Sequence, residues 1–247
     1  MRSGEDVQRD RGEQALTPLR RTFWRLYRWA SERLYNELAW AYELVAWLVS
    51  AGQWDRWRRQ TLDHFAGERV LEIGFGTGAL LVAATQRGYR VWGVDRSRAM
   101  HRVAARRIRR KGAAVASRIL DRRVIAVAQA MPFANGMFDT IVSTFPSGYI
   151  AEAVTLQEVR RLLRARGENT PPGRFVLTGI GYRADRGWLR WLFGWVFGRR
   201  SGDSVTAYAA FAKALGFRVS VAEDTSAHVR VPVLILEAAD GRDPRAS

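Results

Sequence analysis

The sequence predicts an α/β protein built on a seven-stranded, mostly parallel sheet, with helices on both faces, an antiparallel last strand and a helical N-terminal extension. Three observations predict this fold. Short apolar segments alternate with amphipathic ones from Arg69 onward, which is typical of strands connected by helices in a parallel sheet. A glycine-rich loop follows the first apolar segment, and the last two apolar segments are joined by a short connection.

The predicted elements follow one another in a regular order. Strands are expected at residues 70–73, 90–95, 123–127, 138–143, 173–178, 217–222 and 231–237. Helices are expected at residues 78–87, 97–111, 151–165 and 206–215. The last two strands have no helix between them, so we expect an antiparallel hairpin at one edge of the sheet.

The chain divides into a main domain and flanking segments. Aromatic and aliphatic side chains recur at three- and four-residue steps through residues 18–64, which predicts a helical extension. The main domain is expected at residues 65–239, with an aromatic, basic insertion at 181–202. The apolar part of this insertion suits a lipid interface or a lid over an apolar ligand, and equally a core helix packed on the extension. Residues 1–17 and 240–247 are polar and are expected to be disordered tails.

The composition excludes several kinds of chemistry. The chain has no cysteine, which rules out disulfides, thiolate zinc sites and cysteine nucleophiles. Its three histidines are scattered without ligand spacing, so no metal site is expected. The N-terminus lacks a signal-peptide pattern and the most apolar stretch is too short to span a bilayer, so a cytoplasmic location is expected, with peripheral membrane association open.

The net charge is strongly positive, at +16, and 38 of the 40 basic residues are arginine. Residues 65–181 carry 19 basic and 8 acidic residues, which is most of the excess. Such a field attracts nucleic acid, anionic lipid or an acidic substrate without choosing among them. The helix expected at 97–111 has a basic face that is either simply solvated or an RNA contact, and the lack of interleaved aromatic residues makes RNA less favoured.

The segment from Val70 to Gly78 carries the clearest functional signal. An apolar strand ends in Gly74, Gly76 and Gly78 at alternating positions, with the acid Glu72 just before them. Glycine is needed where the backbone takes a positive φ or where a ligand lies against the main chain. The spacing differs from the G-x-G-x-x-G pattern of dinucleotide-binding proteins, and an acid beside the loop suits a cationic ligand better than a pyrophosphate. The alternative role for Glu72 is a salt bridge at the strand end.

Asp95 ends the second predicted strand, 21 residues after Gly74. An acid at this place in an open α/β sheet can accept hydrogen bonds from ribose hydroxyls. Because a helix is expected to begin just after it, the alternative is a helix N-cap.

The stretch VLEIGFGTG…GVDRS resembles motifs I and II of class I S-adenosylmethionine-dependent methyltransferases. Residues 128–133 and 136–142 are similar to the "A-x-x-L-P-F…F-D-x-V" region of methyltransferase type 11, the subgroup that includes quinone and sterol methyltransferases. The resemblance covers about residues 66–180. It implies a Rossmann-like sheet, a methyl-transfer activity and S-adenosyl-L-methionine as the cofactor.

The resemblance also implies roles for individual residues. The glycine loop and Glu72 would hold the methionine end of the cofactor, and Asp95 the ribose. The family usually has Gly-Asp-Ala where this chain has Ala126-Val127-Ala128, so Val127 replaces the acid that contacts adenine. The backbone of Ala128 and the side chain of Gln129 could substitute, although Gln129 is equally explained as a solvated loop residue. The predicted cofactor-binding residues are Glu72, Gly74, Gly76, Gly78, Asp95, Arg96, Ala128, Gln129 and Thr144.

The sequence says less about the residues that contact the methyl acceptor than about those that bind the cofactor. Residues 143–149 should face the methyl group, and Ser147 and Tyr149 are candidate acceptor contacts, although ordinary loop polarity explains them as well. Methyl transfer from a sulfonium needs mainly alignment and exclusion of water, and no catalytic acid or base is assigned. The expected acceptor is a small hydrophobic molecule such as a lipid, quinone or isoprenoid, with an anionic membrane surface as a candidate partner and nucleic acid less favoured. The alternatives are an RNA or protein methyltransferase and an inactive methyltransferase-like binding protein.

Overall fold

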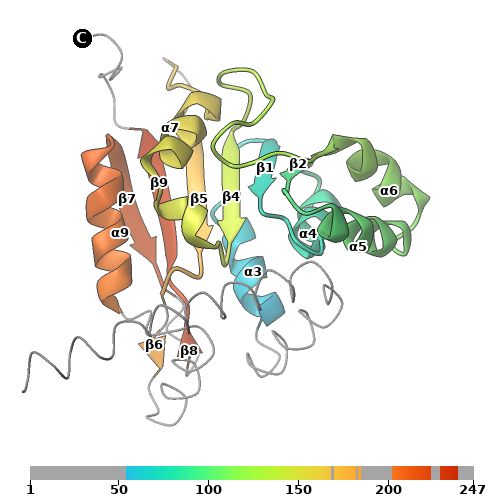
Figure 1. The fold of residues 1–247 in the computed structure, drawn as a ribbon, viewed down its shortest axis with the longest axis horizontal. Coiled ribbons are helices and arrows are strands. Elements are labelled where there is room, and N and C mark those ends of the chain that lie inside the picture. Colours follow the sequence, from blue (N-terminus) through green and yellow to red (C-terminus); the bar gives the residue numbers. More distant parts are fainter. Residues whose placement is uncertain (1–53, 168–169, 182, 185–201, 224–228, 239–247) are drawn as a thin grey trace, which may run out of the picture.

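The structure is a computed structural model that describes residues 54–167, 170–181, 183–184, 202–223 and 229–238 (Figure 1). Both predicted tails, most of the predicted helical extension and most of the predicted insertion lie outside these residues. The proposed domain boundaries therefore stay predictions. Within the described residues, no helix combines the length and the apolar character needed to cross a bilayer.

A seven-stranded sheet forms the centre of the molecule, as predicted. Its strands lie in the order β3-β2-β1-β4-β5-β9-β7, and β9 runs antiparallel to both of its neighbours whereas the others pair in parallel. The strands are β1 (Arg69–Ile73), β2 (Arg90–Val94), β3 (Arg123–Val124), β4 (Thr140–Thr144), β5 (Arg174–Thr178), β7 (Phe217–Ala222) and β9 (Val233–Ala238). The expected hairpin is present at this end of the sheet, with β7 at the edge and β9 inside it. A separate two-stranded pair joins β6 (Arg183–Ala184) to β8 (Val229–Arg230).

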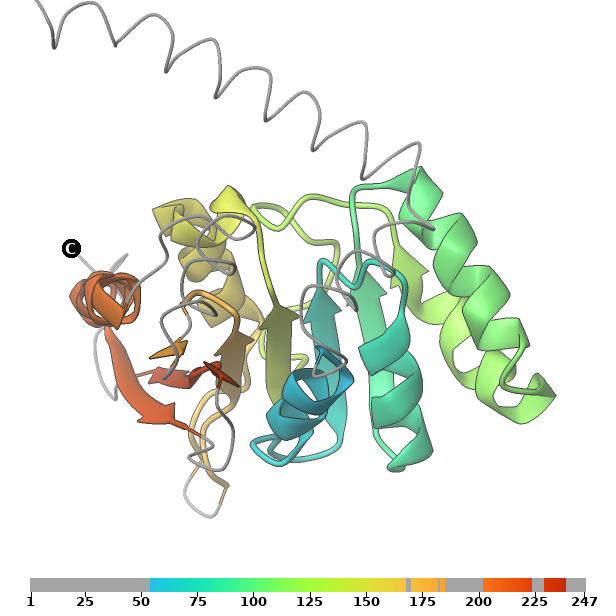
Figure 2. The same cartoon turned by 90° about the horizontal axis from the view of Figure 1, so that it is seen from below.

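Helices cover both faces of the sheet, as predicted (Figures 1 and 2). They are α3 (Trp54–Leu62), α4 (Ala79–Gln86), α5 (Arg98–Arg109), α6 (Ala113–Ile119), α7 (Ala153–Leu162) and α9 (Gly202–Ala214), with 3-10 turns η1 (Leu120–Arg122) and η2 (Gly148–Ala151). The helix α6 was not predicted. The predicted third strand is shortened to two residues, because the chain turns out of the sheet after Val124 and leaves Ile125 and Val127 about half exposed.

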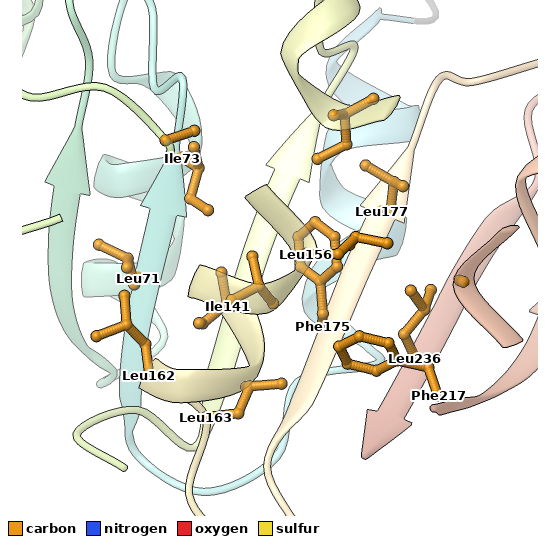
Figure 3. Packing of buried hydrophobic residues seen from close by; sticks show 14 of the residues in the cluster. Leu71, Ile73, Ile141, Leu156, Leu162, Leu163, Phe175, Leu177, Phe217 and Leu236 are labelled. Carbon is orange, nitrogen blue, oxygen red and sulfur yellow. The ribbon is translucent and has the colours of Figure 1, made fainter. Parts of the chain in front are cut away.

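The period-two alternation of each strand separates the core into two layers. Leu71, Ile141 and Phe175 point to the face covered by α7 and α9 (Figure 3). Val70 points to the opposite face, where side chains of α3, α4, α5 and α6 pack. Glu72 therefore points toward the face of α3 and α4, because side chains two apart on a strand share a face.

Candidate cofactor-binding site

The three predicted glycines form a loop whose conformation requires them. At the carboxyl end of β1, Gly74, Gly76 and Gly78 have φ angles of 69°, 51° and 74°, values that residues with a side chain rarely adopt. The loop is tied to the next strand, because the Gly74 N–H donates to the Val94 carbonyl at 2.7 Å. A Cβ on Gly78 would lie 3.0 Å from the Ala104 Cβ of α5. The loop therefore leaves bare main chain facing the end of the sheet.

Asp95 connects this loop to the start of α5. Its Oδ2 accepts a hydrogen bond from the Gly76 N–H at 2.9 Å, and its Oδ1 accepts one from the Ser97 N–H at 2.8 Å. The N-cap of α5 is Ser97, whose hydroxyl accepts from the Met100 N–H at 3.3 Å, so the N-cap alternative for Asp95 is wrong. A carboxylate has about four acceptor positions, and Asp95 can therefore hold the loop and still accept further hydrogen bonds.

Glu72 is a buried acid with an unsatisfied oxygen. The residue is only 2% exposed, and its Oε2 has no hydrogen-bond partner among the described residues. Burial raises the pKa of Glu72 to about 8; the nearby charge of Arg58 in α3 opposes this rise, and the charge of Asp95 adds to it. At neutral pH Glu72 therefore keeps its proton, and a ligand that brings a positive charge next to it would favour its ionised form.

The raised pKa makes Glu72 a source of pH-dependent stability. Because the pKa is about 8 in the folded protein and 4.5 in the reference state, the folded chain holds a proton that the unfolded chain releases between these values. We expect this contribution to the free energy of unfolding to be full below about pH 4.5 and to be lost, by on the order of 5 kcal/mol, as the pH rises to about 8. Urea denaturation of wild type and Glu72→Gln at pH 5, 6.5 and 8 measures it. If the free energy of unfolding changed equally with pH in the two proteins, the raised pKa would not belong to Glu72.

The end of β4 adds a group of hydroxyls beside the glycine loop. The Ser143 hydroxyl donates to the Ile73 carbonyl at 2.9 Å and lies 2.9 Å from the Tyr149 hydroxyl. The Tyr149 hydroxyl also lies 2.8 Å from where a Cβ on Gly74 would be. Of the two predicted acceptor contacts, the structure thus brings Tyr149 to the loop. Ser147 is exposed on the turn before it, and no described contact brings it to the loop.

The crowding of Gly74 by Tyr149 predicts a coupled pair of substitutions. Gly74→Ala should lower stability by about 1–2 kcal/mol for the positive φ, and more because its methyl group meets the Tyr149 hydroxyl. Tyr149→Phe removes that hydroxyl, so the double variant should be more stable than the sum of the single changes by about 1 kcal/mol. Thermal and urea denaturation of the four proteins gives the coupling energy. Strict additivity would show that the two side chains do not meet.

Sequence reasoning missed the aromatic contact that places α3 over this site. Phe145 has a φ of 51°, and its ring lies 6.1 Å from that of Trp57, a fully buried residue of α3. Thr144, one of the predicted cofactor-binding residues, is half-buried at the end of β4 and pairs in register with Thr178. A Phe-Pro pair following an apolar strand gave no indication of the positive φ at Phe145.

The predicted adenine side is arranged differently from the methionine side. Gln129 donates its amide to Glu152 at 2.7 Å, so its side chain is held toward α7. Ala128 is buried, Arg96 is exposed, and Val127, which stands in place of the usual acid, is 48% exposed.

His101 packs beside Asp95, under the predicted site. Its Nε2 lies 3.0 Å from the Asp95 carbonyl oxygen, and its ring makes an edge contact with Phe75. Burial, with the neighbouring charge of Arg123, lowers the pKa of His101.

The chemistry of these groups can be compared with possible ligands. The glycine loop at the end of β1 and the unsatisfied Oε2 of Glu72 fit the cationic amino-acid end of S-adenosylmethionine, and Asp95 fits a ribose. A pyrophosphate would be repelled by a carboxyl group at the same place. No group of three His, Asp or Glu side chains that could hold a metal ion is found in the part of the chain that the structure describes. The fold and site together define an α/β protein whose groups suit a cationic ligand with a nucleoside, the kind of cofactor that methyltransferases use.

Comparisons with known proteins agree with this interpretation. Residues 70–167 match a family described as "Methyltransferase domain". A demethylmenaquinone methyltransferase of Symbiobacterium thermophilum is 31% identical over 152 residues, which is 58% of this chain and 56% of the relative. A ubiquinone/menaquinone biosynthesis C-methyltransferase of Geotalea uraniireducens is 30% identical over 55% of this chain and 59% of its own. The chain thus spans somewhat less than two thirds of the length of these relatives.

Solved structures support the same fold. A protein of Methanococcus maripaludis superposes with a TM-score of 0.63 and 18% identity, covering 85% of this chain and 96% of that one. Geranyl diphosphate C-methyltransferase from Streptomyces coelicolor superposes with a TM-score of 0.53 and 15% identity, covering 74% of this chain and 78% of that one. At these identities the likeness shows the fold alone.

Proposed function

We propose that this chain is an enzyme that transfers the methyl group of S-adenosylmethionine to a small hydrophobic acceptor, such as a quinone, lipid or isoprenoid. The observation that carries the proposal is the loop at the end of β1. Its glycines carry no side chains beside the buried carboxyl group of Glu72, whose Oε2 is unsatisfied. The carboxylate of Asp95, at the end of the neighbouring strand, holds the loop in place.

Each predicted residue has a role in this proposal. Gly74, Gly76 and Gly78 leave room for the methionine end, Glu72 receives its ammonium group, and Asp95 accepts from the ribose hydroxyls. Ala128 and Gln129 border the adenine, with Arg96 and Thr144 at the rim of the site. The cofactor supplies a methyl group on a sulfonium that is already activated as a leaving group. The protein's own contribution is to align the two reactants and to exclude water.

The relatives and the surroundings of the site support an apolar acceptor. Two relatives are named as methyltransferases of quinones. In this chain, Trp57 and Phe145 bring aromatic rings to the end of β4, next to the loop. An apolar acceptor would be stabilised by such surroundings. We infer a peripheral position on the cytoplasmic side of a membrane, where acceptors of this class are concentrated.

The proposal is tested by methyl transfer with labelled cofactor to extracts separated into lipid, RNA and protein fractions. We expect label in the lipid fraction from wild type and none from Asp95→Ala. Label in RNA or protein would refute the acceptor class. Calorimetry with S-adenosylhomocysteine is the second measurement, because the exposed Val127 at the adenine side is the feature that favours an inactive binding protein. A folded sample that binds neither this ligand nor S-adenosylmethionine at millimolar concentration would refute the enzyme itself.

A further inference from the structure

The helices α5 and α6 form one end of the molecule (Figures 1 and 2), and their sequence is rich in basic residues. Between residues 96 and 123 the chain has eleven basic residues and a single acid, Asp121. We define the exposed ones as the α5–α6 basic surface: Arg96, Arg98, Arg102, Arg106, Arg109, Arg110, Lys111 and Arg118.

The eight cations of this surface lie together without acidic side chains paired to them in the described part of the chain. Elsewhere several arginines form ion pairs: Arg87 with Asp63, Arg161 with Glu158, and Arg174 with Glu237. A cluster of eight exposed cations at one end therefore calls for a separate explanation.

The spacing on α5 places the charges in one row. Arg98, Arg102, Arg106 and Arg109 follow one another at helical spacing, on the side opposite the buried Ala104 and Ile108. The row is about 18 Å long. Like charges four residues apart destabilise a helix, and a cation in its first turn opposes the helix dipole. The row therefore costs stability in the isolated protein, and a negatively charged partner would remove that cost.

We propose that the α5–α6 basic surface binds the headgroups of an anionic lipid bilayer. This inference rests on the proposed function for the nature of the acceptor, because α5 begins directly after Asp95 and Ser97 and so places one end of the surface beside the site. Docking there holds the site at the membrane in which an apolar acceptor is dissolved. Each arginine near an anionic bilayer strengthens the attraction, and salt weakens it.

The lack of aromatic rings in this surface favours lipid over RNA. Binding of single-stranded RNA relies on exposed rings on which bases stack. Residues 96–123 contain no Phe, Trp or Tyr. Trp92 of the neighbouring strand β2 packs on the other face of the sheet, against Phe138.

Vesicle flotation with the full chain tests the proposal. The vesicles contain phosphatidylcholine with or without about one third phosphatidylglycerol, an anionic fraction sufficient for electrostatic attraction. Two variants change the same number of charges to glutamine, which preserves helix propensity. The test variant carries changes at Arg102, Arg106 and Arg109, and the control variant carries them at Arg166, Lys213 and Arg218.

We expect wild type to float only with the anionic vesicles and to be released by 0.5 M salt, since this concentration shortens the reach of surface charge. The test variant should partition about 150-fold less than wild type, and the control variant within threefold of it. Absence of flotation, or equal losses in the two variants, would overturn the proposal. So would preferential binding of an RNA oligonucleotide that the test variant abolishes. Flotation is read without methyl transfer, so failure of the proposed activity would show separately, in the calorimetry with S-adenosylhomocysteine.

Discussion

Replacing Asp139 by alanine is expected to lower the free energy of unfolding by about 3 kcal/mol, because it leaves two partly exposed guanidinium groups and two backbone N–H donors without their buried acceptor. Asp139 is only 3% exposed at the start of β4. Its carboxylate accepts from the N–H groups of Glu68 and Arg69, both at 2.9 Å, and pairs with the guanidinium groups of Arg69 at 3.0 Å and Arg164 at 2.7 Å. It therefore joins the entry to β1, the start of β4 and the segment after α7.

Asp63 offers a matched control for this prediction. It also pairs with an arginine at 2.7 Å, Arg87, but both side chains are largely exposed, so Asp63→Ala should cost less than about 1 kcal/mol. Urea denaturation of both variants measures the difference. If Asp139→Ala were no more destabilising than Asp63→Ala, burial would not decide the strength of these ion pairs.

The same residue predicts part of the acid sensitivity. Burial alone would raise the pKa of Asp139, but the hydrogen bonds from Arg69 and Glu68 and the charge of Arg164 lower it below its ordinary value of 3.8. A lowered pKa means that the stabilisation is complete above about pH 4 and is lost as the pH falls through the folded value. Asp139→Asn, which cannot be ionised, should therefore show a flatter loss of stability between pH 4 and 2 than wild type.

The sheet could be predicted because its signals are local. Each strand is a short apolar run with a clear end, and β7, at Phe217–Ala222, has the predicted bounds. The prediction failed at Arg123–Val124, where apolar residues continue to Val127 but the chain leaves the sheet. An apolar run shows that burial is favourable, but only the tertiary context shows that Ile125 and Val127 stay exposed.

The part of the site that depends on backbone conformation could be predicted from the sequence. Positive φ angles explain the glycines. The carboxylate of Asp95 accepts from the loop at Gly76, which was not predicted, and its ribose contact stays a prediction. The hydroxyl pair of Ser143 and Tyr149 could not be predicted in the same way. It forms only when the end of β4 comes next to Ile73 of β1, which is a contact between residues about 70 positions apart. The sequence likewise identified Asp139 only as the acid of the F-D-x-V motif. Its structural role depends on contacts among three separate segments of the chain.

Asp95→Ala is expected to lower the affinity for S-adenosylhomocysteine by about 100-fold or more, which corresponds to loss of a charge-assisted contact together with disorder of the loop. The substitution removes the predicted ribose acceptor. It also leaves the N–H groups of Gly76 and Ser97 without the two carboxylate oxygens that accept from them. The glycine loop would then have to find new partners before a ligand could lie against it.

Asp95→Asn separates the two effects. Asparagine has the same shape, but only one of its two terminal atoms accepts a hydrogen bond, so either Gly76 or Ser97 must face an NH₂ group. We therefore expect the asparagine variant to lose nearly as much affinity as the alanine variant, although it keeps the volume. Calorimetry with S-adenosylhomocysteine gives the affinities, and thermal denaturation without ligand gives the stabilities.

Ser97→Ala is the control, because it affects the same turn without removing an acceptor from the loop. Its hydroxyl caps α5, so the substitution should cost about 1 kcal/mol of stability and change the affinity less than threefold. A cooperatively folded Asp95→Ala protein that binds the ligand as tightly as the Ser97→Ala protein would show that the carboxylate serves only the loop. The ribose would then need another partner, and the assignment of the second-strand acid to the cofactor would be wrong.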